Sequence, residues 1–336
     1  MKVLVTGAGG FLGRHVVDSL LAHGLPVRAM VRPTADLSGC SWRDEVELVE
    51  SDLRTDTDLV SALSGVDVVV HLAARVSGSD EERFASTVVG TERLLAAMSH
   101  HPVTRVVLVS SYSVYDWQAI AGSLTEEAPL ADHPYDRDGY TVAKVWQEKI
   151  TREASEQLGF ELVVLRPGFI WGEENRDISG LGISVGRCLV VIGPRTRPPM
   201  THVDNCAELV TLAVGSPAAA GRTFNVVDTP LLTSWRWAAL LSGTGRRQTR
   251  VPVPYRVGET LVRMVALASR TIFPAGGRLP SLFVPTRFQA RFKPLEHSAT
   301  EAREALGWSP QNRLGGAAGV PQARSLLRRQ RTWGNR

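Results

Sequence analysis

The chain has 336 residues with 38 basic and 34 acidic side chains, which leaves a formal net charge of +4. With 43% hydrophobic and 21% charged residues, it has the composition of a globular protein with one large domain or a main domain and a smaller partner. Up to about residue 311 the basic residues are mixed with acidic ones, so the main body is not expected to bind nucleic acid.

Cysteines are few and widely separated. Cys40, Cys188 and Cys206 do not have the number or spacing of a disulfide framework or a metal cluster, so we expect no metal site and a reduced, cytoplasmic protein. The first apolar run starts at residue 2, which leaves no room for a signal peptide. No apolar run approaches the roughly 20 residues that span a bilayer, so we expect no membrane span.

Short apolar runs alternate with longer amphipathic stretches in the first half of the chain. The runs predict strands at about 2–6, 26–31, 46–50, 66–71, 105–110 and 160–165, and the stretches predict helices at about 11–23, 56–63, 82–99 and 139–158. Strands that alternate with helices in this way form a parallel sheet covered on both faces. The expected class is therefore α/β, a Rossmann fold with a doubly wound parallel sheet.

The regular alternation fades after about residue 170. We expect a Rossmann domain at 1–168 and a smaller second region at 169–312 that can return an element to the first domain. Residues 313–336 contain six arginines and no acidic residue. For this basic stretch a flexible tail is favoured over a binding arm.

The sequence TGAGGFLG at 6–13 predicts a phosphate-binding loop. Gly7, Gly10 and Gly13 follow the first predicted strand and open the first predicted helix, where glycines allow a tight turn and a close approach to a pyrophosphate. The alternative is an ordinary strand–turn–helix connection. We expect Phe11 and Leu12, within the same loop, to contact the cofactor as well.

The segment PVRAMVRP at 26–33 indicates which cofactor binds. An acidic residue at the end of the second strand would bind the adenosine ribose of NAD, but here Val31 and Arg32 follow one another. The guanidinium of Arg32 can bind the 2′-phosphate of NADP, and Arg28 is a weaker second candidate. NADP(H) is therefore the expected cofactor, with NAD(H) as the alternative. The alternative role for Arg32 is that of a solvated arginine at the end of a strand, without a ligand.

Other residues are expected beside the cofactor at the carboxyl ends of the third and fourth strands. Asp52 can accept a hydrogen bond from the adenine amino group, or it can simply cap the next helix. The motif HLAA occupies 71–74 at the end of the fourth strand.

The sequence YTVAK places Tyr140 and Lys144 four residues apart, on one face of a predicted helix. The run LVSSYSVY at 108–115 brings the hydroxyl of Ser111 to the edge of the sheet where the cofactor is expected. These side chains suit hydride transfer: Tyr140 exchanges a proton, and Lys144 favours the phenolate and holds the nicotinamide ribose. Ser111 stabilises charge on the substrate oxygen.

With these motifs the chain resembles the extended short-chain dehydrogenase/reductases, also called the NAD-dependent epimerase/dehydratase family. The likeness also includes LRPGFIWG (165–172), THVDN (201–205) and LGWSP (306–310). It implies a Rossmann domain with a small substrate domain and the catalytic roles given above for Ser111, Tyr140 and Lys144. From it we further expect cofactor contacts from Leu53, Leu72, Ala73, Ala74, Tyr140, Lys144 and Pro167. We expect substrate contacts from Ser111, Tyr112, Phe169 and Trp171.

Three positions depart from the family pattern. Thr87 replaces the usual asparagine, Asp116 replaces a glycine, and Trp171 replaces a tyrosine. All three are expected near the substrate cleft, so they bear on the identity of the substrate more than on the chemistry.

The segment LRPGFIWG resembles the ketoreductase branch, which includes 3β-hydroxysteroid dehydrogenase-like and dihydroflavonol reductase-like enzymes. The expected function is an NADP(H)-dependent ketoreductase or alcohol dehydrogenase for a fairly hydrophobic small molecule. Trp235 and Trp237 would fit such a pocket, or they pack the small domain. The alternatives are a nucleotide-sugar epimerase, dehydratase or reductase and a non-catalytic NADP-sensing protein. The family likeness also allows a homodimer through helices at about 84–99 and 139–158.

Overall fold

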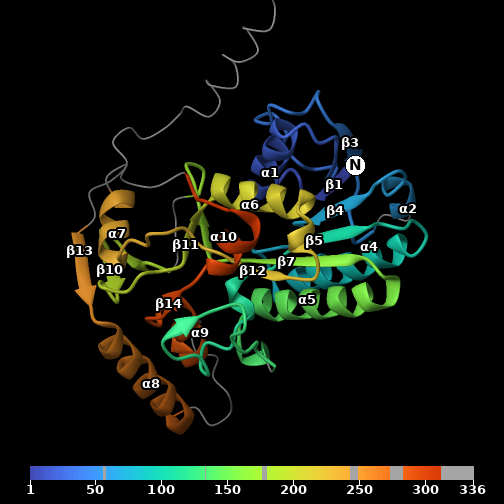
Figure 1. Ribbon diagram of the computed structural model, residues 1–336. Coiled ribbons are helices and arrows are strands. Elements are labelled where there is room, and N and C mark those ends of the chain that lie inside the picture. Colours follow the sequence, from blue (N-terminus) through green and yellow to red (C-terminus); the bar gives the residue numbers. More distant parts are fainter. Residues whose placement is uncertain (56–57, 133, 176–179, 243–248, 273–282, 312–336) are drawn as a thin grey trace, which may run out of the picture.

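A computed structural model describes residues 1–55, 58–132, 134–175, 180–242, 249–272 and 283–311 (Figure 1). The predicted basic tail at 313–336 lies outside these residues. Among the described helices, none has both the length and the apolar character needed to cross a membrane.

A seven-stranded sheet with every neighbouring pair parallel forms the centre of the molecule. Its spatial order is β3-β2-β1-β4-β5-β7-β12, so the direction of winding reverses between β1 and β4. This confirms the predicted Rossmann fold. The strands are β1 (Val3–Thr6), β2 (Val27–Val31), β3 (Glu47–Glu50), β4 (Val68–His71), β5 (Arg105–Val109), β7 (Glu161–Pro167) and β12 (Thr223–Val226).

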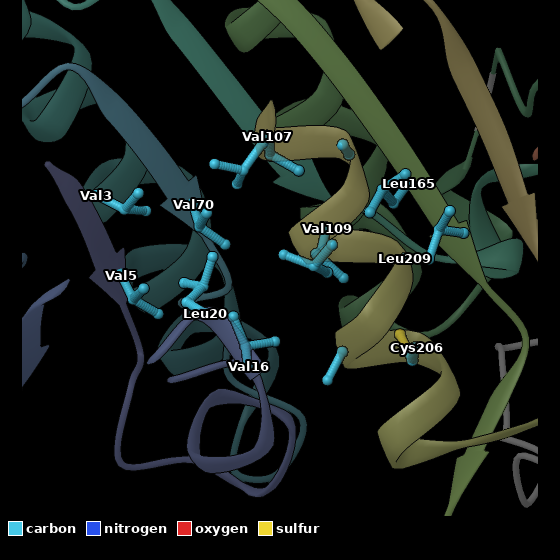
Figure 2. Close-up of a cluster of buried hydrophobic side chains, with 14 of the residues drawn as sticks. Val3, Val5, Val16, Leu20, Val70, Val107, Val109, Leu165, Cys206 and Leu209 are labelled. Carbon is cyan, nitrogen blue, oxygen red and sulfur yellow. The ribbon is translucent and has the colours of Figure 1, made fainter. Parts of the chain in front are cut away.

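Helices cover both faces of this sheet because successive strand residues point to opposite sides. Val3 and Val5 of β1 pack with helices α1 and α6 in the cluster of Figure 2, whereas Leu4 packs on the other side with α2 and α4. The helices of the two layers are α1 (Phe11–Ala22), α2 (Leu59–Ala62), α4 (Gly90–Met98), α5 (Gly139–Leu158), α6 (Val203–Gly215) and α10 (Thr300–Leu306).

The predicted helix at 82–99 is divided in the structure. It begins earlier, at α3 (Asp80–Phe84), where the Ser79 hydroxyl and the Glu82 side chain form a capping box. A π-helical turn at Ala85–Val89 follows and leads into α4. The predicted helix at 56–63 is shorter, since α2 covers Leu59–Ala62 and residues 56–57 lie outside the described residues.

Helix α5 places the YTVAK motif at the edge of the sheet. Asp138 caps its first turn by accepting a hydrogen bond from the Thr141 N–H at 3.1 Å, and the helix ends at Gly159, which is left-handed with φ of 76°. A side chain at Gly139 would collide with the Asp80 carboxylate, so the glycine lets the α3 and α5 segments approach closely.

The smaller region is built mainly from residues after Pro167. It contains the sheet β13-β10-β9, the strand pairs β8–β11 and β14–β6, and helices that lie beside them (Figure 1). Helix α6 and strand β12 return from this part of the chain to the Rossmann layer. Its elements are β8 (Phe169–Trp171), β9 (Gly182–Val185), β10 (Cys188–Ile192), β11 (Met200–His202), α7 (Ser234–Ser242), β13 (Thr249–Val253), α8 (Tyr255–Ile272), α9 (Pro285–Phe292) and β14 (Glu296–His297), with β6 (Ser123–Leu124) supplied by the first region.

Candidate active site

A cavity of about 1060 Å³ lies at the carboxyl ends of the central strands. Residues directly after β1, β2, β4, β5 and β7 contribute to its wall, as is usual for the ligand crevice of a doubly wound sheet. The wall includes every predicted cofactor and substrate residue except Trp171 and the second phosphate candidate, Arg28. These residues are Gly7, Gly10, Phe11, Leu12, Gly13, Arg32, Asp52, Leu53, Leu72, Ala73, Ala74, Ser111, Tyr112, Tyr140, Lys144, Pro167 and Phe169.

The glycine loop has the geometry of an anion-binding turn. Gly7 is left-handed with φ of 72°, and a Cβ at Gly13 would lie 2.2 Å from the Gly7 carbonyl oxygen. Helix α1 begins directly after this turn, and its N-cap, Gly10, has no side chain that could cap the first N–H groups. These donors and the positive end of the helix dipole fit the pyrophosphate of a dinucleotide.

Arg32 lies on the cavity wall as an exposed side chain just beyond β2. Within the described ranges no carboxylate forms an ion pair with it. Arg28 is different: its side chain is buried, donates to the Ala62 and Ser64 carbonyl oxygens and pairs with Glu47. The suggestion that Arg28 binds a cofactor phosphate is therefore wrong.

Asp52 is also on the wall, but its carboxylate is already bound. Arg54 donates to it from Nε at 3.0 Å and from Nη2 at 2.6 Å, and this interaction lowers the pKa of Asp52 to about 2. The neighbouring Ser51, which the sequence did not single out, lines the same wall. Its buried hydroxyl has no hydrogen-bond partner in the described part of the chain.

The structure brings Ser111, Tyr140 and Lys144 together. Tyr140 and Ser111 both line the cavity, the Ser111 side chain is close enough to act on the pKa of Tyr140, and Lys144 lies one helical turn further along α5. Lys144 is only 2% exposed, and its ammonium donates to the Val109 carbonyl oxygen and to Gln147 Oε1, both at 2.8 Å. Ser110 is buried and donates to Glu148 at 2.8 Å, which supports the choice of Ser111 as the reactive serine.

The pKa values of the two titrating groups are shifted in opposite directions. Burial raises the pKa of Tyr140 to about 12, although the Ser111 side chain acts to lower it. Burial lowers the pKa of Lys144 to about 7, although Glu148 acts to raise it. The net effect on Tyr140 is therefore a rise, which differs from the lowered pKa expected from the sequence because burial outweighs the groups that favour the phenolate, and at neutral pH Tyr140 keeps its proton.

A buried polar network that the sequence did not predict lies behind Lys144. Gln147 Nε2 donates to the Thr91 hydroxyl at 2.9 Å and contacts His71 Nε2 at 3.1 Å. His71 in turn forms a 2.7 Å hydrogen bond with Thr6 at the end of β1. Burial lowers the pKa of His71 to about 3, so this imidazole is neutral. The network fixes Lys144 relative to the strand ends.

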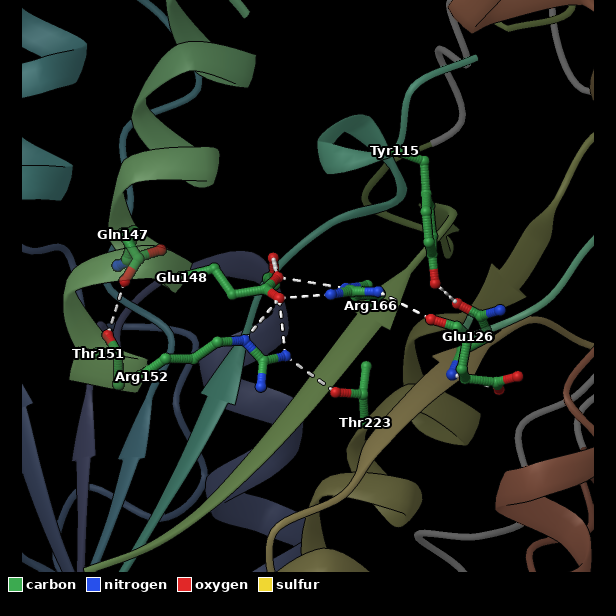
Figure 3. A network of polar contacts seen from close by, with 10 residues as sticks. Tyr115, Glu126, Gln147, Glu148, Thr151, Arg152, Arg166 and Thr223 are labelled. Carbon is green, nitrogen blue, oxygen red and sulfur yellow. Dashed lines mark hydrogen bonds and ion pairs between the residues drawn. The ribbon is translucent and has the colours of Figure 1, made fainter. Parts of the chain in front are cut away.

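A second buried network holds α5 against the sheet (Figure 3). Glu148 of α5 forms an ion pair with Arg166 of β7, and both side chains are 3% exposed. Arg152 pairs with the same carboxylate at 2.9 Å and donates to the Thr223 hydroxyl of β12. These contacts connect the helix that carries Tyr140 and Lys144 to two strands of the central sheet.

Trp171 does not lie on the cavity wall, so its predicted substrate contact is wrong. Its side chain is 8% exposed and packs edge-to-face on His202 and on Trp237, with ring centroids 4.5 and 5.1 Å away. Strand β11 pairs with β8 at this position and helix α7 covers it. Trp237 is therefore a packing residue, and Trp235 contacts Arg250.

Two other departures from the family pattern are also absent from the wall. Thr87 is fully buried, and its hydroxyl accepts a hydrogen bond from the Arg75 N–H at 3.2 Å, whereas the adjacent Ser86 lines the cavity. Asp116 accepts from the Gln118 N–H at 3.0 Å in a local turn.

We call the part of the cavity wall beside Ser111 and Tyr112 the substrate end, where the predicted Phe169 also lines the cavity. This part of the wall contains residues that the sequence analysis missed, namely Trp117 and three arginines contributed by distant segments. No motif marks these arginines, because they enter the wall only through tertiary packing. They are Arg137, Arg287 and Arg291. Within the described residues no three His, Cys, Asp or Glu side chains are grouped as metal ligands.

A family model described as the NAD dependent epimerase/dehydratase family matches residues 3–226. This segment carries the glycine loop, Ser111, Tyr140 and Lys144, and the returning strand β12. The chain belongs to this family. It is an NAD(P)-dependent oxidoreductase of the extended short-chain dehydrogenase/reductase type.

Relatives of this chain include proteins named as sterol dehydrogenases and ketoreductases. A 3β-hydroxysteroid-dehydrogenase/decarboxylase of Arabidopsis thaliana is 25% identical over 91% of this chain and 75% of its own. A ketoreductase of Stigmatella aurantiaca, named for a 3-oxo-4-farnesyl-dihydroquinoline-1-oxide, is 28% identical over 92% of both chains. The UDP-glucose 4-epimerase structure of Thermotoga maritima covers 94% of this chain and 95% of its own, with a TM-score of 0.69 and 20% identity, and shows the shared fold.

Proposed function

We propose that this protein is an NADPH-dependent ketoreductase that reduces a carbonyl group of a fairly hydrophobic small molecule. The observation that supports this most directly is the grouping of Ser111, Tyr140 and Lys144 on the wall of the same cavity as the glycine loop. The names of the relatives, which include ketoreductase and 3β-hydroxysteroid dehydrogenase, point to the same reaction class.

The proposed cofactor is NADP(H) in preference to NAD(H). The glycine loop and the start of α1 would hold the pyrophosphate, and Lys144 would hold the nicotinamide ribose. Arg32 would bind the 2′-phosphate, because it lies just after β2 on the cavity wall. An acidic residue at this point would bind the ribose of NAD, but the chain has Val31 and Arg32 there. When bound, this cofactor supplies the hydride.

The protein's own groups would handle the oxygen and the proton. The Ser111 hydroxyl would donate a hydrogen bond to the carbonyl oxygen, and the Tyr140 hydroxyl would give it a proton as the hydride reaches the carbon. With its pKa raised to about 12, Tyr140 is protonated at neutral pH, as a proton donor must be. The Lys144 ammonium would stabilise the phenolate that remains.

Tyr112, Trp117 and Phe169 line the substrate end, and their rings favour an apolar substrate body. A nucleotide-sugar epimerase, dehydratase or reductase is the second candidate, supported by the family match and by the fold shared with UDP-glucose 4-epimerase.

The experiment that separates the two is a cofactor-coupled assay of the pure protein with steroid, flavonoid, acyl and sugar-nucleotide ketones. Reduction of apolar ketones with NADPH is expected. Turnover of UDP- or dTDP-sugars alone would contradict the proposal.

Cytoplasmic location and a homodimer remain proposals. The three free cysteines support the first. For the second, α4 and α5 lie on the same side of the sheet and contact one another, so they present neighbouring helices for a twofold interface. Light scattering should give twice the 36.5 kDa mass of the chain, and a monomer at all concentrations would contradict the dimer.

A further inference from the structure

Arginines without carboxylate partners occupy the substrate end of the cavity. Arg137, Arg287 and Arg291 line this wall, and within the described residues no carboxylate lies within 4.0 Å of their side-chain nitrogens. Several other arginines of the same cavity are neutralised locally. Those pairs are Arg54 with Asp52, Arg75 with Glu82 and Arg83 with Asp80.

Arg137 is held in a buried position by weak hydrogen bonds. It is 8% exposed, and its terminal nitrogens donate to the carbonyl oxygens of Ser113 and Tyr115 at 3.3 and 3.4 Å. Its Nε is buried and has no hydrogen-bond partner in the described chain. Asp138 and Asp116 act favourably on this guanidinium, but neither forms an ion pair with it. A buried cation that is weakly hydrogen-bonded and has no ion-pair partner costs free energy, and an anionic ligand would offset that cost.

Arg287 comes from α9 to the same place. Its Nη2 donates to the backbone carbonyl oxygen of Arg137 at 2.8 Å, and its own Nε is buried without a partner among the described residues. Burial lowers the pKa of Arg137, and the nearby positive charge of Arg287 acts in the same direction, whereas Asp138 and Asp116 act to raise it. An anion beside the two guanidinium groups would relieve the repulsion between them.

These arginines are next to the reacting groups. Arg137 precedes Tyr140 by three residues, and the carbonyl oxygen that it contacts belongs to Ser113, two residues after Ser111. Ring side chains of Tyr112 and Trp117 share this part of the wall. The site therefore combines an apolar surface with a localised positive charge.

We propose that Arg137 and Arg287 bind an anionic group of the substrate, a carboxylate or a phosphate, while its carbonyl lies at Ser111 and Tyr140. This inference rests on the proposed function and makes it narrower, because the substrate becomes an apolar ketone with an acidic group. Guanidinium groups suit such a ligand, since they donate paired hydrogen bonds to carboxylate and phosphate oxygens.

Calorimetric titration of the full chain saturated with NADP⁺ tests this proposal without requiring turnover. One probe pair is 4-oxo-4-phenylbutanoate and its methyl ester, and a second pair is UDP-glucose and uridine. The acid should bind at least about tenfold more tightly than the ester. Preference for UDP-glucose over uridine instead would identify phosphate as the source of the anion.

The matched variants are Arg287→Gln and Arg256→Gln, because Arg256 is an exposed arginine of α8 that does not line the cavity. Arg287→Gln should abolish the preference for the charged probe and leave ester binding within about threefold, whereas Arg256→Gln should retain the preference. Arg137→Lys, which keeps a charge in place, should show an intermediate preference.

Two results would overturn the proposal: no preference for the charged member of either pair in the wild-type protein, or an unchanged preference in Arg287→Gln. If the acid binds selectively but no ketone is reduced with NADPH, the anion site stands and the proposed reductase function fails.

Discussion

Arg32 is the side chain on which the proposed preference for NADPH depends. Arg32→Ala is expected to raise the KM for NADPH by about tenfold to hundredfold and that for NADH by less than about threefold, because only NADPH offers a phosphate to the guanidinium. Arg43→Ala is the matched control, since Arg43 is exposed in the same segment but does not line the cavity. Equal effects of Arg32→Ala on both cofactors would remove the proposed role.

Lys144 should determine how reduction depends on pH. Its pKa is lowered to about 7, so the ammonium is present below that pH and is lost as the pH rises through it. We expect kcat/KM for NADPH to fall above about pH 7, up to tenfold per pH unit, because it reports the free enzyme. Tyr140, with a pKa raised to about 12, cannot produce this step.

The variant Lys144→Met should remove this step from the profile and lower kcat/KM by about a hundredfold or more. Steady-state rates between pH 5.5 and 9.5, about the range that brackets the shift, measure both effects. A flat wild-type profile across this range would contradict the assignment.

At the scale of elements, α5 depends on its ion pairs with β7. Glu148→Ala would leave Arg166 buried without its counter-charge, so we expect a loss of about 3–5 kcal/mol in the free energy of unfolding. Glu153→Ala is the control on the same helix, because Glu153 is exposed, and its effect should stay within about 0.5 kcal/mol. Urea unfolding at pH 7 measures both, and similar losses would show that the network does not stabilise α5.

The elements also show what the sequence could and could not predict. The strands of the central sheet were predictable from buried apolar runs, and the ends of α5 from Asp138 and Gly159. A returning element from 169–312 was expected, but its identity as β12 and α6 was not, because a short apolar segment does not show which sheet it joins. The π-helical turn at 85–89 was missed since it does not interrupt the helical pattern.

The same limit applies to the site. The residues of the glycine loop and of YTVAK could be predicted because each set lies within one turn or one helix, so local geometry alone brings its members together. Arg28 was misjudged because nothing in PVRAMVRP shows that it faces Glu47 on the neighbouring strand. Tertiary contacts bury Trp171 in a hydrophobic cluster, and they bring Arg137 and Arg287 to the cavity wall. Such contacts between distant segments cannot be predicted from a local motif.

At the scale of the whole molecule, the two parts of the chain contribute different properties to one cavity. The Rossmann part provides the glycine loop, Arg32 and the reactive groups, whereas α9 of the C-terminal part brings Arg287 and Ala290 to the substrate end. The strand pair β14–β6 ties this C-terminal part back to the loops that follow β5. The reaction is therefore expected from the first part and the substrate selection from both.

The measurement that tests the central claim most directly is NADPH-dependent ketone reduction by the wild-type protein and by Tyr140→Phe. The variant removes the proton donor and keeps the ring, so we expect kcat to fall by about 10²–10⁴-fold while the Kd for NADPH, measured by fluorescence titration, stays within about threefold. A Tyr140→Phe protein that reduces ketones at the wild-type rate would contradict the account.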